Sequence, residues 1–227
     1  MRQTVELNGL QYAEAIRYLG YGDAMPGEDV LALLRAGEQA LLAAATPQFA
    51  YRVFSAQAVQ GGIALVGTQL ILRGNSILEH LAGCDQAALL CATLGAGVDA
   101  LTRTAQVRDM AQAVVLDALG SAAVEQVCAR AEEHMRASFP NRFFTYRFGL
   151  GYGDLPLAQA GEFFQLLDAS RALGVAVTAG NSFVPRKTVA CVIGMSEREI
   201  QSMRKGCATC NLRKTCGYRA RGDRCGY

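Results

Sequence analysis

The feature that most constrains the fold is a long helical pattern over residues 98–139. Apolar residues recur there at intervals of three and four, which is typical of an amphipathic helix, and a break is expected near Arg108. The expected apolar side consists of Met110, Val114, Ala118, Val124, Cys128 and Met135. The pattern predicts one dominant helix in a chain whose other regular segments are short.

Around this helix, short helices and strands follow one another without a regular βαβ alternation. Helices are expected at residues 11–19, 27–45, 75–81 and 161–173, and a last one runs from the capping box Ser196-Glu197-Arg198-Glu199 to Lys205. Strands are expected at 49–56, 62–66, 68–73, 87–93, 143–147, 175–178 and 188–193. Several strand pairs are joined by short turns. The pattern favours an α+β fold with a largely antiparallel twisted sheet flanked by helices, and a short Cys-rich C-terminal appendage.

Composition and charge divide the chain into a body and a tail. Hydrophobic residues make up 51% and charged residues 19% of the 227 residues, which is ample for a packed core. From Arg204 to Tyr227, seven basic residues face one acid, so the tail carries +6 and the body −4. We expect a domain at 1–203 and a separate Cys/Arg-rich tail at 204–227. No apolar run reaches the length of a membrane helix, and no secretion signal is recognisable, so a soluble, cytoplasmic protein is expected.

Cysteines crowd into this tail at Cys207, Cys210, Cys216 and Cys225. Thiolates so close together, in a segment too small for its own core, predict zinc or an iron–sulfur cluster as the organising group. The alternative is a tail with free or redox-active thiols. The remaining cysteines stand singly among apolar neighbours and are predicted to be small buried hydrophobic residues; they are Cys84, Cys91, Cys128 and Cys191.

A glycine-rich segment at residues 146–156 is the first candidate for ligand binding. It follows an expected strand, and its glycines leave backbone groups open to a close approach. Arg147 can bind a carboxylate with its planar guanidinium, and Tyr152 can stack or hydrogen-bond. The spacing is not the G-x-G-x-x-G of a dinucleotide site. The alternative is a plain glycine turn with a structural arginine.

The long helix carries a second candidate. Asp117, Ser121 and Glu125 share one stripe beside the apolar side. A carboxylate at the margin of a core meets a basic partner or faces a ligand cavity, and the alternative is a solvated helix edge. His80 and His134 are expected among ordinary surface residues. No nucleophile-and-base set is recognisable, so no catalytic residue is predicted.

Several motifs together resemble a known family. Arg147-x-x-x-Gly151-Tyr152 is followed by a helix segment at 162–168 and by a Gly-hydrophobic-Thr strand start at 173–178. Their order and spacing resemble the S-adenosylmethionine-binding activation domain of cobalamin-dependent methionine synthase. Residues 17–21, 93–95 and 116–125 resemble its short, free-standing members, so the resemblance covers most of residues 10–195. Gly153 stands where the family commonly has a proline.

The resemblance implies a stand-alone reactivation subunit, an accessory component of a methyltransferase system. It would bind S-adenosylmethionine and support reductive remethylation of cob(II)alamin on a cobalamin-binding methionine synthase subunit, with a flavodoxin-like or other electron donor. By position, Arg147 would pair with the methionine carboxylate and Tyr152 would line the ligand. The backbone at Gly149 and Gly151 would hold the adenosyl part. Glu125 would lie near the cationic amino end.

Two other functions remain open. A non-enzymatic module that senses S-adenosylmethionine, or that only docks on the corrinoid protein, would carry the same motifs. Nucleic-acid binding through the basic metal-binding tail is less favoured, because the positive charge is confined to that tail, where only Tyr218 and Tyr227 offer aromatic rings. An iron–sulfur cluster in the tail would instead serve to deliver an electron.

Overall fold

The structure is a computed structural model that describes residues 2–22, 24–200, 214–220 and 222. These residues belong to two compact units, each built from separate stretches of sequence. Unit 1 comprises residues 1–52, 90–139 and 160–190, and unit 2 comprises residues 53–89, 140–159 and 191–227. The boundary expected between body and tail, at residues 203–204, lies outside the described residues and stays a prediction.

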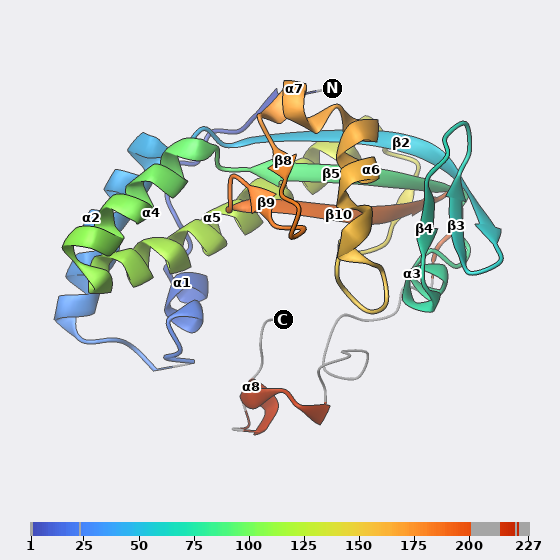
Figure 1. Ribbon diagram of the computed structural model, residues 1–227. Coiled ribbons are helices and arrows are strands. Elements are labelled where there is room, and N and C mark those ends of the chain that lie inside the picture. The colour runs from blue at the N-terminus through green and yellow to red at the C-terminus, as the bar shows by residue number, and fades with distance from the viewer. Residues whose placement is uncertain (1, 23, 201–213, 221, 223–227) are drawn as a thin grey trace. The chain divides into compact units, whose positions relative to one another are not determined.

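Unit 1 contains the long helices. Its helices are α1 (Tyr12–Tyr18), α2 (Glu28–Ala44), α4 (Ala96–Arg108), α5 (Met110–Ser138), α6 (Ala160–Leu167) and α7 (Ala169–Leu173). Figure 1 shows α2 and α4 lying along α5, and α1 also packs on α5. Its short strands are β1 (Arg2–Thr4), β8 (Ala176–Val177) and β9 (Phe183–Val184). The helix predicted at 98–139 therefore exists as α4 and α5.

Asp109 makes the break between α4 and α5. Its backbone is extended, with φ −153° and ψ 105°. Its carboxylate accepts hydrogen bonds from the N–H groups of Ala111 at 2.9 Å and Gln112 at 3.3 Å. This arrangement is an N-cap, which pairs donors that the first turn of a helix leaves without partners. The break expected near Arg108 is thus confirmed.

The core of unit 1 includes the contact between α2 and α5. Leu34 and Leu41 from α2 are fully buried, as are Leu116 and Leu119 from α5. Gly37 allows the close approach, because a Cβ at this position would lie only 2.9 Å from Cδ1 of Leu119. Small residues at such a contact let two helices pack with few voids.

The apolar side of α5 is buried along most of its length, as predicted, but not at its start. Val124, Cys128 and Met135 are buried, whereas Met110 is 62% and Val114 52% exposed. The stripe is continuous by helical period. Its first turns are exposed because they border a cavity instead of the packed core.

Unit 2 contains the short strands and hairpins. Its elements are β3 (Gly62–Leu65), β4 (Ile71–Arg73), α3 (Asn75–His80), β6 (Phe143–Phe144), β7 (Phe148–Gly149), the 3-10 helix η1 (Leu157–Gln159) and α8 (Gly217–Ala220). β2 (Gln48–Val59), β5 (Gln86–Thr93) and β10 (Thr188–Ser196) contribute residues to both units. The strand order is β4-β3-β2-β5-β10-β6, with β1 also paired to β2 and β7 to β10. Every pair of described strands with a stated register is antiparallel. The predicted α+β class is confirmed.

Several expected elements differ from the structure. The helix predicted at 161–173 is divided, because Asp168 takes a left-handed backbone conformation, with φ 52°, between α6 and α7. The strand predicted at 143–147 is reduced to β6. The capping-box prediction is wrong over residues 196–200, because Ser196 pairs with Phe143 in the sheet and no helix begins there. The rest of that predicted helix, at 201–205, lies outside the described residues.

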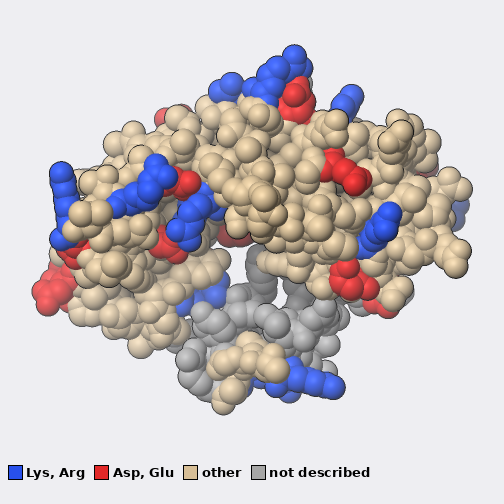
Figure 2. Space-filling model, viewed as in Figure 1, with Lys and Arg blue, Asp and Glu red and all other residues tan. Residues whose placement is uncertain are grey.

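Charged side chains of both signs are interspersed over the face drawn in Figure 2. Ion pairs join some of the charged side chains of the chain, such as Arg130 with Glu133 and Arg171 with Asp168. Among the described helices, none combines the length and the hydropathy that crossing a membrane would require.

Candidate functional site

The glycine-rich segment forms a tight turn in unit 2, directly after β7. The N–H of Tyr152 donates to the carbonyl of Gly149, and the N–H of Gly151 donates to the carbonyl of Leu155, both at 3.0 Å. Gly151 has φ +84°, a conformation that side chains disfavour. The turn therefore brings Gly149, Gly151 and Tyr152 together, and its internal hydrogen bonds fix the backbone.

Tyr152 presents its ring beside this turn. The side chain is 63% exposed, and its ring centroid lies 6.2 Å from that of Phe148. A Cβ on Gly149 would lie 3.4 Å from Cδ1 of Tyr152, so the ring lies over bare glycine backbone. Arg147 and its neighbour Tyr146 are both half-buried, and burial raises the pKa of Tyr146. One short segment thus carries an exposed aromatic ring, a glycine turn fixed by internal hydrogen bonds and a half-buried arginine.

Asp154 attaches the turn to the start of α3. Its carboxylate accepts the N–H of Asn75 at 2.7 Å and the N–H of Ser76 at 2.9 Å. These two hydrogen bonds lower the pKa of Asp154. The sequence pattern did not single out Asp154, because the helix that it caps lies 78–79 residues earlier in the chain.

His80 is buried, with 3% of its surface exposed, so the expectation that it lies on the surface is wrong. Its Nε2 lies 2.9 Å from Oγ1 of Thr145, and its ring centroid lies 4.5 Å from that of Tyr146. The same Thr145 oxygen accepts the N–H of Gly194 at 2.7 Å. These buried contacts hold the backbone that leads into Arg147.

In unit 1, the polar stripe on α5 lies at the margin of the core. Asp117, Ser121 and Glu125 are all half-buried, which agrees with the interpretation from helical period. Lys187 supplies a basic partner, with its Nζ 2.9 Å from Oδ1 of Asp117 and 2.9 Å from Oγ of Ser121. The stem of Lys187 lies against Gly120, where a Cβ would come within 3.0 Å of its Cε.

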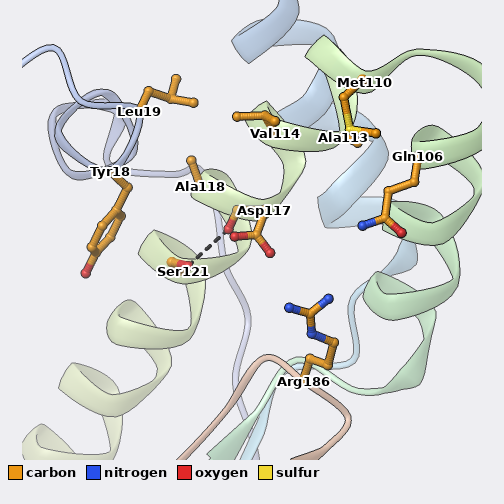
Figure 3. Close-up of a pocket in the computed structure, with 10 residues that line it drawn as sticks. All are labelled: Tyr18, Leu19, Gln106, Met110, Ala113, Val114, Asp117, Ala118, Ser121 and Arg186. Carbon is orange, nitrogen blue, oxygen red and sulfur yellow. Dashed lines mark hydrogen bonds between the residues drawn. The ribbon is translucent and has the colours of Figure 1, made fainter.

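Asp117 and Ser121 also line a cavity of about 370 Å³. Figure 3 shows the groups around it, which come from the end of α1, from α4, from the start of α5 and from the loop before β10. They include Tyr18, Leu19, Gln106, Met110, Val114 and Arg186. Asp117 therefore both meets a basic partner and faces a cavity.

Glu125, one turn further along α5, lies close enough to Tyr18 to affect its ionisation. Burial raises the pKa of Tyr18, and the negative charge of Glu125 raises it further. The guanidinium carbon of Arg17 lies 4.6 Å from the Tyr18 ring centroid, and Arg17 pairs with Glu14 at 2.6 Å. Glu125 belongs to unit 1 and Arg147 to unit 2. Their common role in one ligand site stays a prediction.

Most of the predicted metal ligands lie beyond the described residues. These are Cys207, Cys210 and Cys225, whereas Cys216 is half-buried just before α8. The described part of the chain holds no group of three or more His, Cys, Asp or Glu side chains placed to bind a metal. The metal site in the tail therefore stays a prediction. The scattered cysteines are buried as predicted, apart from the partly exposed Cys84; the buried ones are Cys91, Cys128 and Cys191.

Comparison with known proteins identifies a shared fold. No model of a known protein family matches the sequence, and no curated protein sequence matches it. Among solved structures, the crystal structure of the MetH reactivation domain bound to AdoHcy is similar to this chain, with a TM-score of 0.66. The similarity covers 99% of this chain and 87% of the other, at 14% sequence identity. At this identity the similarity shows the fold alone.

Proposed function

We propose that this chain binds S-adenosylmethionine and serves as a reactivation subunit for a separate cobalamin-binding methionine synthase subunit. The observation that carries the proposal is the fold shared over nearly the whole chain with a reactivation domain bound to AdoHcy. The motif Arg147-x-x-x-Gly151-Tyr152 also supports the proposal, because its spacing resembles that of the S-adenosylmethionine-binding activation domain.

The chemistry of the proposed ligand matches the residues on hand. S-adenosylmethionine carries a carboxylate, which a half-buried guanidinium such as Arg147 binds through parallel hydrogen bonds. The exposed ring of Tyr152, beside the glycine turn at Gly149 and Gly151, suits the flat adenosyl part. The half-buried carboxylate of Glu125 suits the cationic amino end.

In this role the chain contributes binding and positioning. S-adenosylmethionine supplies the methyl group, and the corrinoid of the partner accepts it together with one electron from a separate donor. Arg147 would hold the carboxylate of the methionine part, so that the methyl sulfonium is presented in one orientation. Such a role needs no general acid or base from this chain.

Isothermal titration of the chain with S-adenosylmethionine tests the proposal. We expect saturable one-site binding in the wild type and a loss of about 10- to 100-fold in affinity in Arg147→Ala, the usual effect of removing a charge-assisted hydrogen bond. Arg198→Ala, an exposed arginine of the same unit, is the matched control and should bind as the wild type does.

A second ligand separates a binding role of Arg147 from a structural one. 5′-Methylthioadenosine lacks the methionine carboxylate, so Arg147→Ala should leave its affinity unchanged. Equal losses for both ligands would mean that Arg147 only supports the fold. Absence of S-adenosylmethionine binding by the folded wild type would overturn the proposal.

Reconstitution with a cobalamin-binding methionine synthase subunit tests the reactivation step. Remethylation of cob(II)alamin, with an electron donor and S-adenosylmethionine present, should stop when this chain is omitted. Remethylation that continues without the chain would instead point to a sensor or docking module.

A further inference from the structure

The cavity in unit 1 includes none of the residues assigned above to S-adenosylmethionine. Its volume of about 370 Å³ falls within the range of small-molecule pockets. Figure 3 shows the side chains of Asp117, Gln106 and Arg186 directed into the same space. The cavity therefore calls for an explanation of its own.

Both signs of charge face this cavity. Arg186 is exposed, and within the described residues its guanidinium forms no ion pair. Asp117 is half-exposed even though Lys187 binds its Oδ1 at 2.9 Å, so part of its carboxylate remains open to another donor. The amide of Gln106 adds a neutral donor and acceptor.

The segment that carries Arg186 is held in place. Its backbone N–H donates to Oδ2 of Asp99 at 2.9 Å, and the carbonyl of the next residue, Lys187, accepts the N–H of Leu94 at 3.1 Å. The guanidinium is therefore presented on an anchored backbone. Anchoring of this kind reduces the entropy that a small ligand must overcome on binding.

The opposite side of the cavity is apolar. Met110 and Val114, each more than half exposed, line it together with Leu19, Ala113 and Ala118. Covering such side chains with an apolar group is favourable, at about 0.8 kcal/mol for each buried methylene.

We propose that this cavity binds an α-amino acid with an apolar side chain. Arg186 binds its carboxylate, Asp117 accepts its ammonium, and its side chain covers Met110 and Val114. A simple carboxylate or a simple amine engages only one of the two charged groups. The proposal does not depend on the S-adenosylmethionine site.

Titrations of the full chain with three related probes, followed by NMR, test this assignment. The probes are L-leucine, 4-methylpentanoate, which lacks the ammonium, and 3-methylbutylamine, which lacks the carboxylate. Leucine should bind saturably and more tightly than either of the others. Failure of leucine to saturate, or equal affinity for all three, would overturn the proposal.

Two pairs of exposed-site variants localise the binding. Arg186→Gln should weaken leucine binding about tenfold or more and leave the amine unaffected, whereas Arg103→Gln on α4 should have no effect. Val114→Ser should weaken leucine binding, and Val107→Ser, at a largely exposed valine outside this cavity, should not. Equal losses within either pair would contradict the assignment.

The same variants distinguish the amino-acid cavity from the proposed S-adenosylmethionine site. Arg186→Gln should titrate with S-adenosylmethionine as the wild type does. Leucine binding that persists in Arg147→Ala would show that the cavity acts independently, and its loss there would overturn that independence.

Discussion

Replacement of Thr145 by valine should destabilise the protein strongly. The Thr145 side chain is 1% exposed, and its oxygen accepts the N–H of Gly194 at 2.7 Å and lies 2.9 Å from Nε2 of His80. Valine keeps the shape but removes the hydroxyl, so a buried N–H loses its acceptor and a buried imidazole loses a partner. Each loss costs about 1–3 kcal/mol, so we expect the free energy of unfolding to fall by about 2–6 kcal/mol.

Urea unfolding, followed by circular dichroism and tyrosine fluorescence, measures this change; the chain contains no tryptophan. Thr145→Ser is the matched control, because it keeps the hydroxyl and loses one methyl group, at about 1 kcal/mol. In thermal melts, each kcal/mol should correspond to a shift of about 2–4 °C for a chain of this size. Valine and serine variants of equal stability would refute the reasoning.

Three further predictions concern polar contacts in both units. Asp154→Ala removes the cap of α3 and should lower the free energy of unfolding by about 1 kcal/mol near neutral pH. Because hydrogen bonds lower the pKa of Asp154, this contribution should be lost as the pH falls below about 4. Urea unfolding of the wild type and of Asp154→Ala at pH 7 and pH 3 checks it. Burial and Glu38 raise the pKa of Tyr12 to about 12, so the stability that Tyr12 contributes should be complete below pH about 10 and lost as the pH rises towards 12. The tyrosinate absorbance of Tyr12 is the difference between the wild type and Tyr12→Phe. In a Glu38→Gln background, this absorbance should titrate at lower pH. Lys187→Met should lower the free energy of unfolding by about 1 kcal/mol, because it leaves Asp117 without its basic partner. Adding Asp117→Asn should restore part of this stability. A double variant no more stable than Lys187→Met would contradict the role of the Lys187–Asp117 ion pair.

Local patterns predicted much of the fold, and they failed where distant residues decide the backbone. The helix expected at 27–45 is α2, because its apolar period is undisturbed, and the hairpin expected around Gly67 is present. The pattern at 161–173 gives no sign of the left-handed Asp168. At Ser196, a local capping box gives way to pairing with Phe143, and sheet formation overrides the local preference.

The candidate site shows the same division. Helical period placed Asp117 and Ser121 at the core margin, because that relation involves one helix only. Their partner Lys187 lies 66 residues after Ser121, and no spacing rule links the two. Asp154 was missed for the same reason. Tertiary folding, not local sequence, brings such partners together.

The interleaving of the two units has a consequence for synthesis and for gene structure. Any contiguous fragment that contains all of unit 1, residues 1–190, also carries residues 53–89 and 140–159 of unit 2. On the ribosome, unit 1 lacks its last stretch until residue 190 has been added, by which time two stretches of unit 2 have already been made. Neither unit is therefore one contiguous block of sequence that could be excised or fused to another gene without carrying part of the other unit.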